Sequence, residues 1–419
     1  RSFPMNKQQL AAKIWQSANK MRSKIEANEY KDYILGFIFY KFLCDKLEKF
    51  VIAQGLEQAD FAAELTENGE LVGFIQENLG YFISYDHLFS TWLAQGSDFN
   101  IAQVRDAMSA FSRHIAPNYK AVFDGIFKTL ESGLSKLGDT AASQTSAVKD
   151  LFDLIKDIPT DGRQGYDVLG FIYEYLISMF AANAGKKAGE FYTPAEVSTL
   201  LAKLVAPKAG DRIADPACGS GSLLIKVAKE VQGKNYSLYG QENNGSTWAL
   251  CLMNMFLHEQ DAANITWGDT LNHPQLIEND ALMKFDVVVA NPPFSLDKWG
   301  AENAASDPYQ RFHRGIPPKT KGDYAFISHM IETTHETNGR VGVIVPHGVL
   351  FRGSSEKTIR QQLIEENLLE AVIGLPANLF YGTSIPAAIL IFNRAKGANT
   401  DVLFIDASKA YESGKNQNH

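Results

Sequence analysis

With 419 residues, 45% of them hydrophobic, the chain is long enough for two or three domains with substantial cores, which excludes a largely disordered protein. Its formal net charge of −8 argues against a protein that coats DNA unaided, because phosphate neutralisation requires clustered Lys and Arg. The longest charge-free apolar run near the start, residues 33–40, is far shorter than the roughly 20 residues of a membrane span, and we expect no signal peptide. Three widely separated cysteines indicate neither a disulfide framework nor a metal site, so we expect a cytoplasmic protein without bound metal.

The first part of the chain has helical periodicity. From residue 6 to about residue 157, apolar residues recur three or four positions apart, and no stretch alternates convincingly as strands do. We therefore predict an N-terminal all-helical domain over residues 5–160. Residues 138–147 are rich in small polar side chains and are predicted to form a loop within it.

From about residue 166 strands and helices alternate. Strands are predicted at residues 212–217, 237–242, 265–268, 285–290, 340–345, 369–375 and 386–392, and helices at 222–231, 247–258, 324–337 and 355–366. This alternation predicts an α/β, Rossmann-like domain over residues 161–410, with a seven-stranded mixed sheet. Only about ten residues join its last two strands, so the last strand is predicted to be antiparallel, and residues 402–405 are a candidate further edge strand.

A glycine-containing turn, residues 215–221 (Asp-Pro-Ala-Cys-Gly-Ser-Gly), follows the first predicted strand. Gly219 and Gly221 remove side chains that would block the close approach of a ligand, and Ser222 is able to bond locally or to cap the next helix. A dinucleotide fingerprint would need glycine where Leu224 stands, and no Gly-Lys-Ser/Thr ending is present. The turn therefore predicts a nucleotide-like ligand without a pyrophosphate.

Three carboxylates stand at or just beyond the ends of successive strands beside this turn. Glu242 ends the second strand, where a carboxylate can accept both hydroxyl groups of a ribose. Asp269 follows the third strand and is placed to take an adenine amino group, and Asp215 is placed to face a cationic amino end. Any one of these acids alone is explained as a cap of a strand or helix. Together they suit a ligand with a nucleoside, a sulfonium and an amino-acid tail, and we predict S-adenosylmethionine.

Asn291-Pro292-Pro293-Phe294 follows the fourth predicted strand. Prolines have no N–H group, so this stretch offers mainly acceptors, which suit an exocyclic amino group. Hydrogen bonds to the Asn291 side chain and the Pro292 carbonyl would localise the nitrogen lone pair toward an incoming methyl group. Phe294 offers a face on which a flipped base stacks, at about 1–3 kcal/mol. Two prolines also simply end strands, but the fourth-strand position behind the glycine turn favours methylation of an amino group on a nucleic-acid base.

Residues 311–321 carry four formal positive charges and no acid. Either a solvated loop or a DNA-contacting patch explains such a run. The candidate DNA-binding residues are Arg311, Arg314, Lys319 and Lys321.

The chain resembles the modification (methyltransferase) subunits of type I restriction–modification systems. The matching segments are residues 189–194, 215–221, 291–294, 381–386 and 414–418. The resemblance implies a site-specific DNA methyltransferase that acts on N6 of adenine, in which Asn291, Pro292, Pro293 and Phe294 take the adenine. It also implies cofactor contacts that add to Asp215, Gly221 and Asp269, and these are Glu190, Phe191, Tyr192, Thr193, Pro194, Ala195, Cys218, Gly219, Ser220 and Glu242.

The same resemblance implies partners. A separate specificity subunit reads the sequence of double-stranded DNA and bridges two modification subunits, and a translocating restriction subunit joins them in the complete system. Members of this family usually continue into C-terminal helices that help to dock the specificity subunit. Residues 411–419 are therefore expected to begin a tail that is truncated or missing here.

Two alternatives stay open. A self-sufficient methyltransferase acting on DNA, RNA or a protein glutamine would use the same tetrapeptide, but it needs a recognition domain, and little room follows Phe392. A protein that only senses S-adenosylmethionine would stabilise an assembly without catalysis, and intact Asn291 and Phe294 argue against it.

Overall fold

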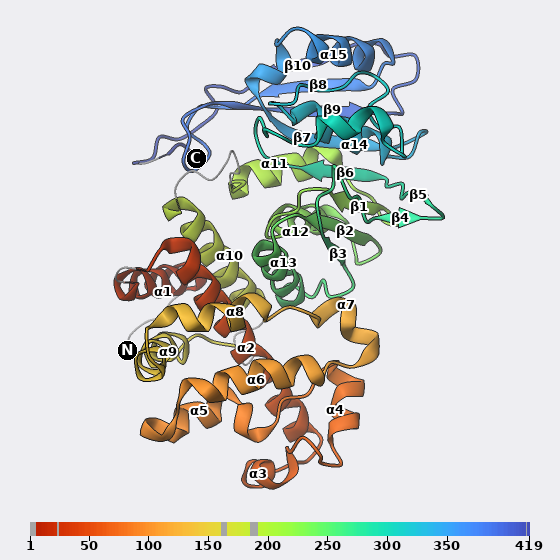
Figure 1. Ribbon diagram of the computed structural model, residues 1–419. Coiled ribbons are helices and arrows are strands. Elements are labelled where there is room, and N and C mark those ends of the chain that lie inside the picture. Colours follow the sequence, from red (N-terminus) through yellow and green to blue (C-terminus); the bar gives the residue numbers. More distant parts are fainter. Residues whose placement is uncertain (1–5, 23–24, 161–165, 185–191, 416) are drawn as a thin grey trace. The chain divides into compact units, whose positions relative to one another are not determined.

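The computed structural model describes residues 6–22, 25–160, 166–184, 192–415 and 417–419, and the chain divides into two compact units (Figure 1). The first unit comprises Arg1–Phe180 with Leu252–Asp261, and the second comprises Ala181–Cys251 with Ala262–His419. The first unit thus includes Leu252–Asp261, a segment that the predicted domain boundaries place in the α/β domain.

The first unit is helical, as predicted, and its described residues contain no strand. Its helices are α1 (Lys7–Met21), α2 (Ala27–Ala53), α3 (Phe61–Glu64), α4 (Val72–Leu79), α5 (Phe89–Gln95), α6 (Ile101–Arg113), α7 (Lys120–Phe123), α8 (Lys128–Gly133), α9 (Ala141–Ile155) and α10 (Tyr166–Asn183). Residues 33–40 are all buried in α2, so this apolar run is part of the core of the helical unit. The Trp92 ring stacks 5.3 Å from Tyr40 and 5.6 Å from Phe152. No helix among the described residues is both long and apolar enough to cross a membrane.

The predicted loop at residues 138–147 is wrong, because α9 already begins at Ala141. Thr140 is the N-cap, and its hydroxyl accepts a hydrogen bond from the Ser143 amide at 3.1 Å. The Ser143 hydroxyl accepts in turn from the Thr140 amide at 3.0 Å. Small polar residues favour both loops and helix caps, and here they form a capping box.

The second unit is built on an eight-stranded sheet, counted over the described residues, in the order β10-β8-β9-β7-β6-β1-β2-β3. Its strands are β1 (Arg212–Asp215), β2 (Ser237–Glu242), β3 (Asn264–Trp267), β6 (Val287–Ala290), β7 (Arg340–Pro346), β8 (Leu369–Gly374), β9 (Ala387–Asn393) and β10 (Leu403–Asp406). The predicted mixed sheet is confirmed, with β9 antiparallel to both β7 and β8. The candidate edge strand is β10, which pairs parallel to β8 and makes the strand count eight where seven were predicted.

A small hairpin, β4 (Ile277–Glu278) and β5 (Ala281–Leu282), lies outside this sheet and was not predicted. Its two turn residues, Asn279 and Asp280, have positive φ values of 52° and 62°. Asn and Asp tolerate this conformation best among residues with a side chain, and two such residues in a row suit the tight turn of a two-residue hairpin.

Helices cover both faces of the sheet: α11 (Ala195–Val205), α12 (Ser222–Glu230), α13 (Gly245–Leu257), α14 (Asp323–Glu332) and α15 (Ser355–Glu365). The side chains of Val341, Val343 and Val345 on β7 pack into the core beneath α14 and α15. On the other face of β7, α11 lies so close to Gly342 that an added Cβ would stand 2.5 Å from the Leu201 side chain. The alternation of β7 therefore positions one layer of helices on each face.

Candidate functional site

The candidate site lies at the carboxyl ends of neighbouring parallel strands. β1 pairs with β2 on one side and with β6 on the other, and β3 continues beyond β2. The chain runs outward through β1, β2 and β3 and then returns to the other side of β1 as β6. The point where the strand order reverses is where open α/β sheets bind ligands.

The turn after β1 has the open backbone that the sequence predicts. Gly219 and Gly221 have φ values of +55° and +82°, a left-handed conformation that favours glycine. A Cβ added at Gly219 would meet no atom within 4 Å, so this side of the turn is accessible. Gly221 is the N-cap of α12 and no side chain caps the helix; the hydroxyl groups of Ser220 and Ser222 instead lie 2.9 Å apart.

Glu242 joins the end of β2 to this turn. One of its carboxylate oxygens accepts a hydrogen bond from the Gly219 amide at 3.1 Å, and the other accepts from the Asn244 amide at 2.7 Å. The carboxylate is therefore held at the glycine turn. Its contact with ribose hydroxyls stays a prediction.

Asp215 is buried, with 2% of its surface exposed. Its Oδ1 accepts a hydrogen bond from the Ala217 amide at 2.9 Å. The pKa of this carboxyl group is raised to about 8, chiefly by burial; the Ala217 hydrogen bond acts in the opposite direction, and the nearby negative charge of Glu242 adds to the increase. Two neighbouring carboxylates, one of them buried, suit a ligand with positive charge. S-adenosylmethionine carries a sulfonium and an amino group, so the residues present fit this cofactor.

The Asp269 carboxylate accepts hydrogen bonds from the residues that directly follow it. Its Oδ1 accepts hydrogen bonds from the Leu271 and Asn272 amides at 3.0 Å and 3.3 Å, and Oδ2 accepts from the Asn272 side chain at 2.7 Å. This is the capping role that the sequence left open for each acid. Its contact with an adenine amino group stays a prediction.

Cys218 lies beneath the turn, buried, with its Sγ 3.9 Å from the Sγ of Cys251. The contact with Cys251 and burial hold the pKa of the Cys218 thiol well above its usual range. A Cβ added at Gly240 would lie 3.0 Å from this sulfur, so the thiol packs closely against β2. The Cys218 side chain therefore packs the turn against β2 and Cys251, and its thiol is unreactive.

The target motif leaves the end of β6 beside two other segments. The Asn291 side-chain amide donates a hydrogen bond to the Thr193 hydroxyl at 2.9 Å, just before α11. The Phe294 ring lies edge-to-face with Phe380, with centroids 6.1 Å apart. Of the other residues assigned to the cofactor by the family resemblance, Pro194 and Ala195 form the N-cap and first residue of α11, and Glu190 and Phe191 lie outside the described residues.

Phe380 packs against the target motif and was not predicted from the sequence. It stands with Tyr381 in the connection between β8 and β9, and the Tyr381 ring stacks on Tyr192 at 6.4 Å. The sequence feature that could have indicated it is the adjacent aromatic pair, Phe380 and Tyr381, in the connection between two predicted strands. This connection is also held by the chain terminus, because Asn418 donates hydrogen bonds to the carbonyls of Asn378 at 2.7 Å and Ala377 at 2.8 Å.

Arg311 and Arg314 do not form the solvent-facing patch that the sequence suggested. Arg311 is 2% exposed and donates to the Asp307 carboxylate at 2.9 Å and to the carbonyls of Thr270 and Leu271. Arg314, at 7% exposed, pairs with acids from distant elements, which are Glu332 at 2.8 Å and Glu366 at 2.7 Å. The guanidinium fork fits carboxylates and carbonyls, so a basic run without acids in sequence is neutralised in the fold.

The two lysines of this segment are more exposed than its two arginines. Lys319 is exposed and Lys321 is partly exposed. The Lys319 carbonyl accepts a hydrogen bond from the Lys298 amide at 2.9 Å, which joins this segment to the chain that follows the target motif. Lys319 and Lys321 therefore keep the exposure that a contact with phosphate requires.

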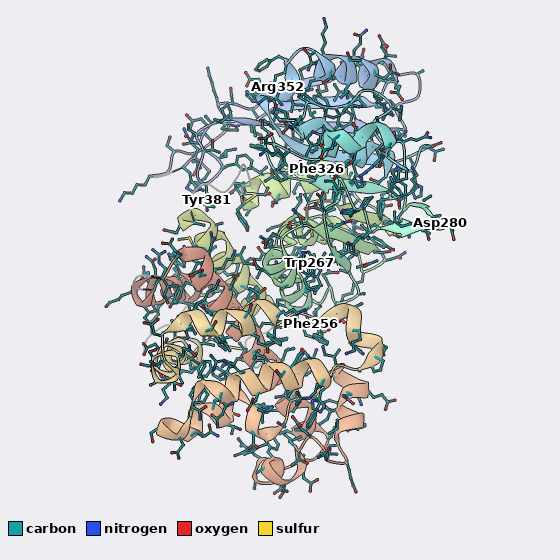
Figure 2. All side chains as sticks on the ribbon, viewed as in Figure 1. Phe256, Trp267, Asp280, Phe326, Arg352 and Tyr381 are labelled. Atoms are coloured by element: carbon teal, nitrogen blue, oxygen red, sulfur yellow. The ribbon has the colours of Figure 1, made fainter. Side chains whose placement is uncertain are left out.

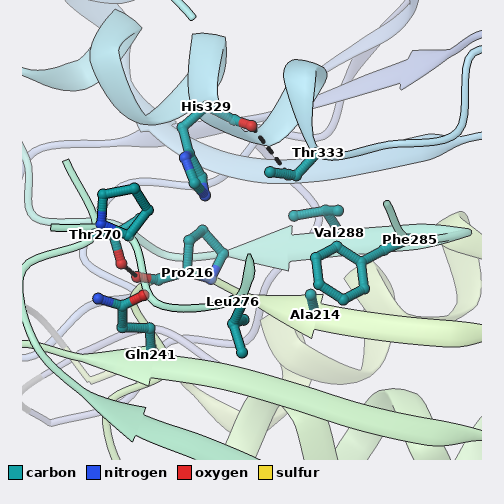
Figure 3. Close-up of a pocket in the computed structure, with 10 residues that line it drawn as sticks. Ala214, Pro216, Gln241, Thr270, Leu276, Phe285, Val288, His329 and Thr333 are labelled. Atoms are coloured by element: carbon teal, nitrogen blue, oxygen red, sulfur yellow. Dashed lines mark hydrogen bonds between the residues drawn. The ribbon is translucent and has the colours of Figure 1, made fainter. Parts of the chain in front are cut away.

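A small cavity lies between the sheet and α14, lined by Pro216, Gln241, Thr270, His329 and other residues (Figure 3). Its volume of about 10 Å³ suits a single water molecule and excludes a cofactor. Burial lowers the pKa of His329 to about 3, with a further contribution from Arg311, so this imidazole is neutral. The cavity is therefore part of the core between the sheet and α14.

An open glycine turn after β1, carboxylates at the strand ends and an Asn-Pro-Pro-Phe motif after β6 define an S-adenosylmethionine-dependent methyltransferase. The chain belongs to the N-6 DNA methylase family, whose model matches residues 164–419, and residues 10–156 match the HsdM N-terminal domain.

The chain is similar to several known proteins. It is 34% identical to the type I restriction enzyme MpnII methylase subunit of Mycoplasma pneumoniae, over 97% of this chain and 80% of the relative. It is 30% identical to the MjaVII methylase subunit of Methanocaldococcus jannaschii, over 92% of this chain and 65% of the relative. The crystal structure of a type I restriction–modification methyltransferase subunit from Streptococcus thermophilus superimposes with a TM-score of 0.88 at 35% identity, over 99% of this chain and 90% of that one.

Proposed function

We propose that this chain transfers the methyl group of S-adenosylmethionine to N6 of an adenine in double-stranded DNA, as the modification subunit of a type I restriction–modification complex. The observation that carries this proposal is the position of Asn291 to Phe294 at the carboxyl end of β6, next to the glycine turn after β1, since Ile213 and Val287 pair in register on these two strands. Cofactor turn and target motif therefore share one edge of the sheet.

The cofactor, when bound, supplies an electrophilic methyl group on its sulfonium. On this proposal Asp215 takes the cationic amino end and Glu242 the ribose hydroxyls, with Gly219, Ser220 and Gly221 exposing backbone to the ligand. Residues 190–195 complete the cofactor site by resemblance, and Asp269 takes the adenine amino group by its position after β3. The raised pKa of Asp215 supports this assignment, because ionising the buried carboxyl group is costly and a cation beside it would remove that cost.

Asn291 and the Pro292 carbonyl accept hydrogen bonds from the two N–H groups of the adenine amino nitrogen. This polarisation draws the nitrogen lone pair out of the ring, toward the methyl group. The hydrogen bond from the Asn291 amide nitrogen to Thr193 supports this geometry, since it fixes which end of the amide is the acceptor for the base. Phe294 and Phe380 give the flipped adenine two aromatic walls.

DNA and further subunits complete the enzyme. A specificity subunit reads the target sequence and bridges two copies of this chain, and a restriction subunit joins them in the full system. Lys319 and Lys321 contact phosphates, whereas Arg311 and Arg314 stabilise the catalytic unit. Residues 5–160 form the helical domain, 161–410 the catalytic domain, and 411–419 the start of a C-terminal tail, in a cytoplasmic protein.

Transfer of a radiolabelled methyl group to DNA tests this function. The purified chain is incubated with labelled S-adenosylmethionine and DNA, with and without its specificity partner, and the modified nucleoside is identified by chromatography. We expect N6-methyladenine, formed at specific sites only with the partner present. Sequence-specific methylation by the chain alone would favour a self-sufficient enzyme, and a product on RNA or protein would refute the DNA assignment.

A further inference from the structure

The residue directly after the target motif has a strained backbone. Ser295 has a φ of 50°, the left-handed conformation that residues with a side chain rarely adopt. Its amide donates a hydrogen bond to Oδ1 of Asp323 at 2.9 Å. Asp323 is the first residue of α14 and only 2% exposed. A buried carboxylate therefore holds the chain at the point where it leaves Phe294.

The Asp323 carboxylate is itself fixed from the other side. Its Oδ2 accepts a hydrogen bond from Arg352 at 2.8 Å, and the same guanidinium nitrogen bonds Glu356 at 3.1 Å (Arg352 is labelled in Figure 2). Glu356 is also 2% exposed. A Cβ added at Gly348 would lie 2.8 Å from the Arg352 guanidinium, so the glycine leaves room for it. The two buried carboxylates and the partly buried guanidinium of Arg352 form one ionic cluster with defined geometry.

Further hydrogen bonds tie the rest of the segment in place. The Gly322 amide donates to the Leu296 carbonyl at 2.9 Å, and the Trp299 indole donates to the Pro318 carbonyl at 2.8 Å. The segment after the target motif is thus joined along its length to residues 318–323. The bond between Ser295 and Asp323 is the member of this series nearest to Phe294.

We propose that Asp323 is a positioning residue for methyl transfer: held by Arg352, it fixes Ser295 in the left-handed conformation and thereby sets the direction of the Asn291–Phe294 segment. This inference rests on the proposed function and deepens it. Asp323 acts through the backbone and touches neither cofactor nor base. Small misplacements of reacting groups lower rates by about 100-fold, so the effect on turnover is large although the contact is indirect.

Three variants separate positioning from stability. Asp323→Ala removes the acceptor of the Ser295 amide. Asp323→Asn keeps an oxygen that can accept this bond. Glu356→Gln is the matched control, because it removes a carboxylate from the same arginine, Arg352, but leaves the groups of the contact between Asp323 and Ser295 unchanged.

Methyl transfer to DNA is measured for each variant in complex with the specificity partner, and cofactor affinity by calorimetry. We expect Asp323→Ala to lower kcat about 100-fold with the Kd for S-adenosylmethionine unchanged within about two-fold. Asp323→Asn should recover most of kcat, and Glu356→Gln should keep it within about three-fold. Wild-type kcat in Asp323→Ala, or equal losses in Asp323→Ala and Glu356→Gln, would overturn the proposal.

A second measurement is independent of catalysis. Hydrogen–deuterium exchange of a peptide containing Ser295 should accelerate in Asp323→Ala and stay at the wild-type rate in Glu356→Gln. Unchanged exchange in Asp323→Ala would refute the positioning contact. A wild-type complex that methylates no DNA would instead refute the proposed function, and the exchange rates would still decide whether Asp323 orders this segment.

Discussion

At the scale of single residues, burial decides what a charged side chain does. The sequence predicts that Asp215 faces a cation, and the structure shows a buried carboxyl group with a raised pKa at this position. The contact with a cation stays a prediction. Arg311 and Arg314 show the opposite outcome, because their acidic partners stand at Asp307, Glu332 and Glu366. Glu332 and Glu366 are separated from Arg314 by 18 and 52 residues, so no local pattern could reveal the ion pairs of Arg314. Asp307 stands at i,i+4 spacing from Arg311, just ahead of the basic run.

Asp215→Asn tests the buried carboxylate through stability. Because the folded-state pKa is raised, the contribution of Asp215 to ligand-free stability is complete below its unfolded value of 3.8 and is lost as the pH rises through about 8. The neutral variant should therefore melt several degrees above wild type at pH 8, at about 2–4 °C per kcal/mol, and close to wild type at pH 4. Calorimetric melting at both pH values measures this. Equal Tm differences at the two values would contradict it.

Thr193→Val tests the orientation of the Asn291 amide. The variant has nearly the same shape but loses the hydroxyl that accepts the Asn291 hydrogen bond. A hydrogen bond contributes about 1 kcal/mol, so we expect kcat to fall roughly five-fold with little change in cofactor affinity. Thr193→Ser, which retains the hydroxyl, is the control and should stay within about two-fold of wild type. If valine and serine behave alike, Thr193 does not orient Asn291.

At the scale of elements, apolar runs bounded by polar residues predicted most strands well. β6 and β9 lie within two residues of their expected positions, because their side chains are nearly all buried and leave a continuous hydrophobic signal. The start of α9 was missed because Thr140 and Ser143 belong equally to loops and caps. The contact between the β8–β9 connection and the target motif could not be predicted from the sequence. An aromatic pair such as Phe380 and Tyr381 does not reveal which distant segment it packs against.

Gly221→Val tests the cofactor turn. A β-branched residue at φ +82° is strained by about 1–2 kcal/mol, and its side chain would crowd the ligand. We expect S-adenosylmethionine binding to be lost while circular dichroism shows a folded protein. Gly233→Val is the matched control, since Gly233 has a φ of +84° but lies in the connection between α12 and β2, with nothing within 4 Å of an added Cβ. Equal affinity in the two variants would place the ligand elsewhere.

At the scale of the whole molecule, the sequence predicted a helical unit followed by a methyltransferase unit, and the described residues have this order. The assignment of Leu252–Asp261 to the helical unit was beyond reach, because it depends on tertiary contacts of the second half of α13. The expectation from net charge, that the chain does not coat DNA unaided, stays a prediction. Substitution of Lys319 and Lys321 allows the contribution of basic side chains to DNA binding to be measured.

Replacing Lys319 and Lys321 with Ala should weaken DNA binding by the complex with its specificity partner to a similar extent across sequences. The slope of log K against log salt is negative, and each lost phosphate contact reduces its magnitude by about 0.9. Gel shifts at several salt concentrations measure this, and Lys234→Ala, an exposed lysine ahead of β2 and away from the carboxyl ends of the strands, is the control. A change confined to one DNA sequence would instead assign these lysines to base recognition.

The most direct test of the central claim is single-turnover methyl transfer by Asn291→Ala, in complex with the specificity partner and saturated with labelled S-adenosylmethionine. Because Asn291 is assigned to the amino group that is methylated, transfer should be abolished, while calorimetry finds a cofactor Kd within about two-fold of wild type. A variant that methylates adenine at the wild-type rate would contradict the assignment of the target motif and the account built on it.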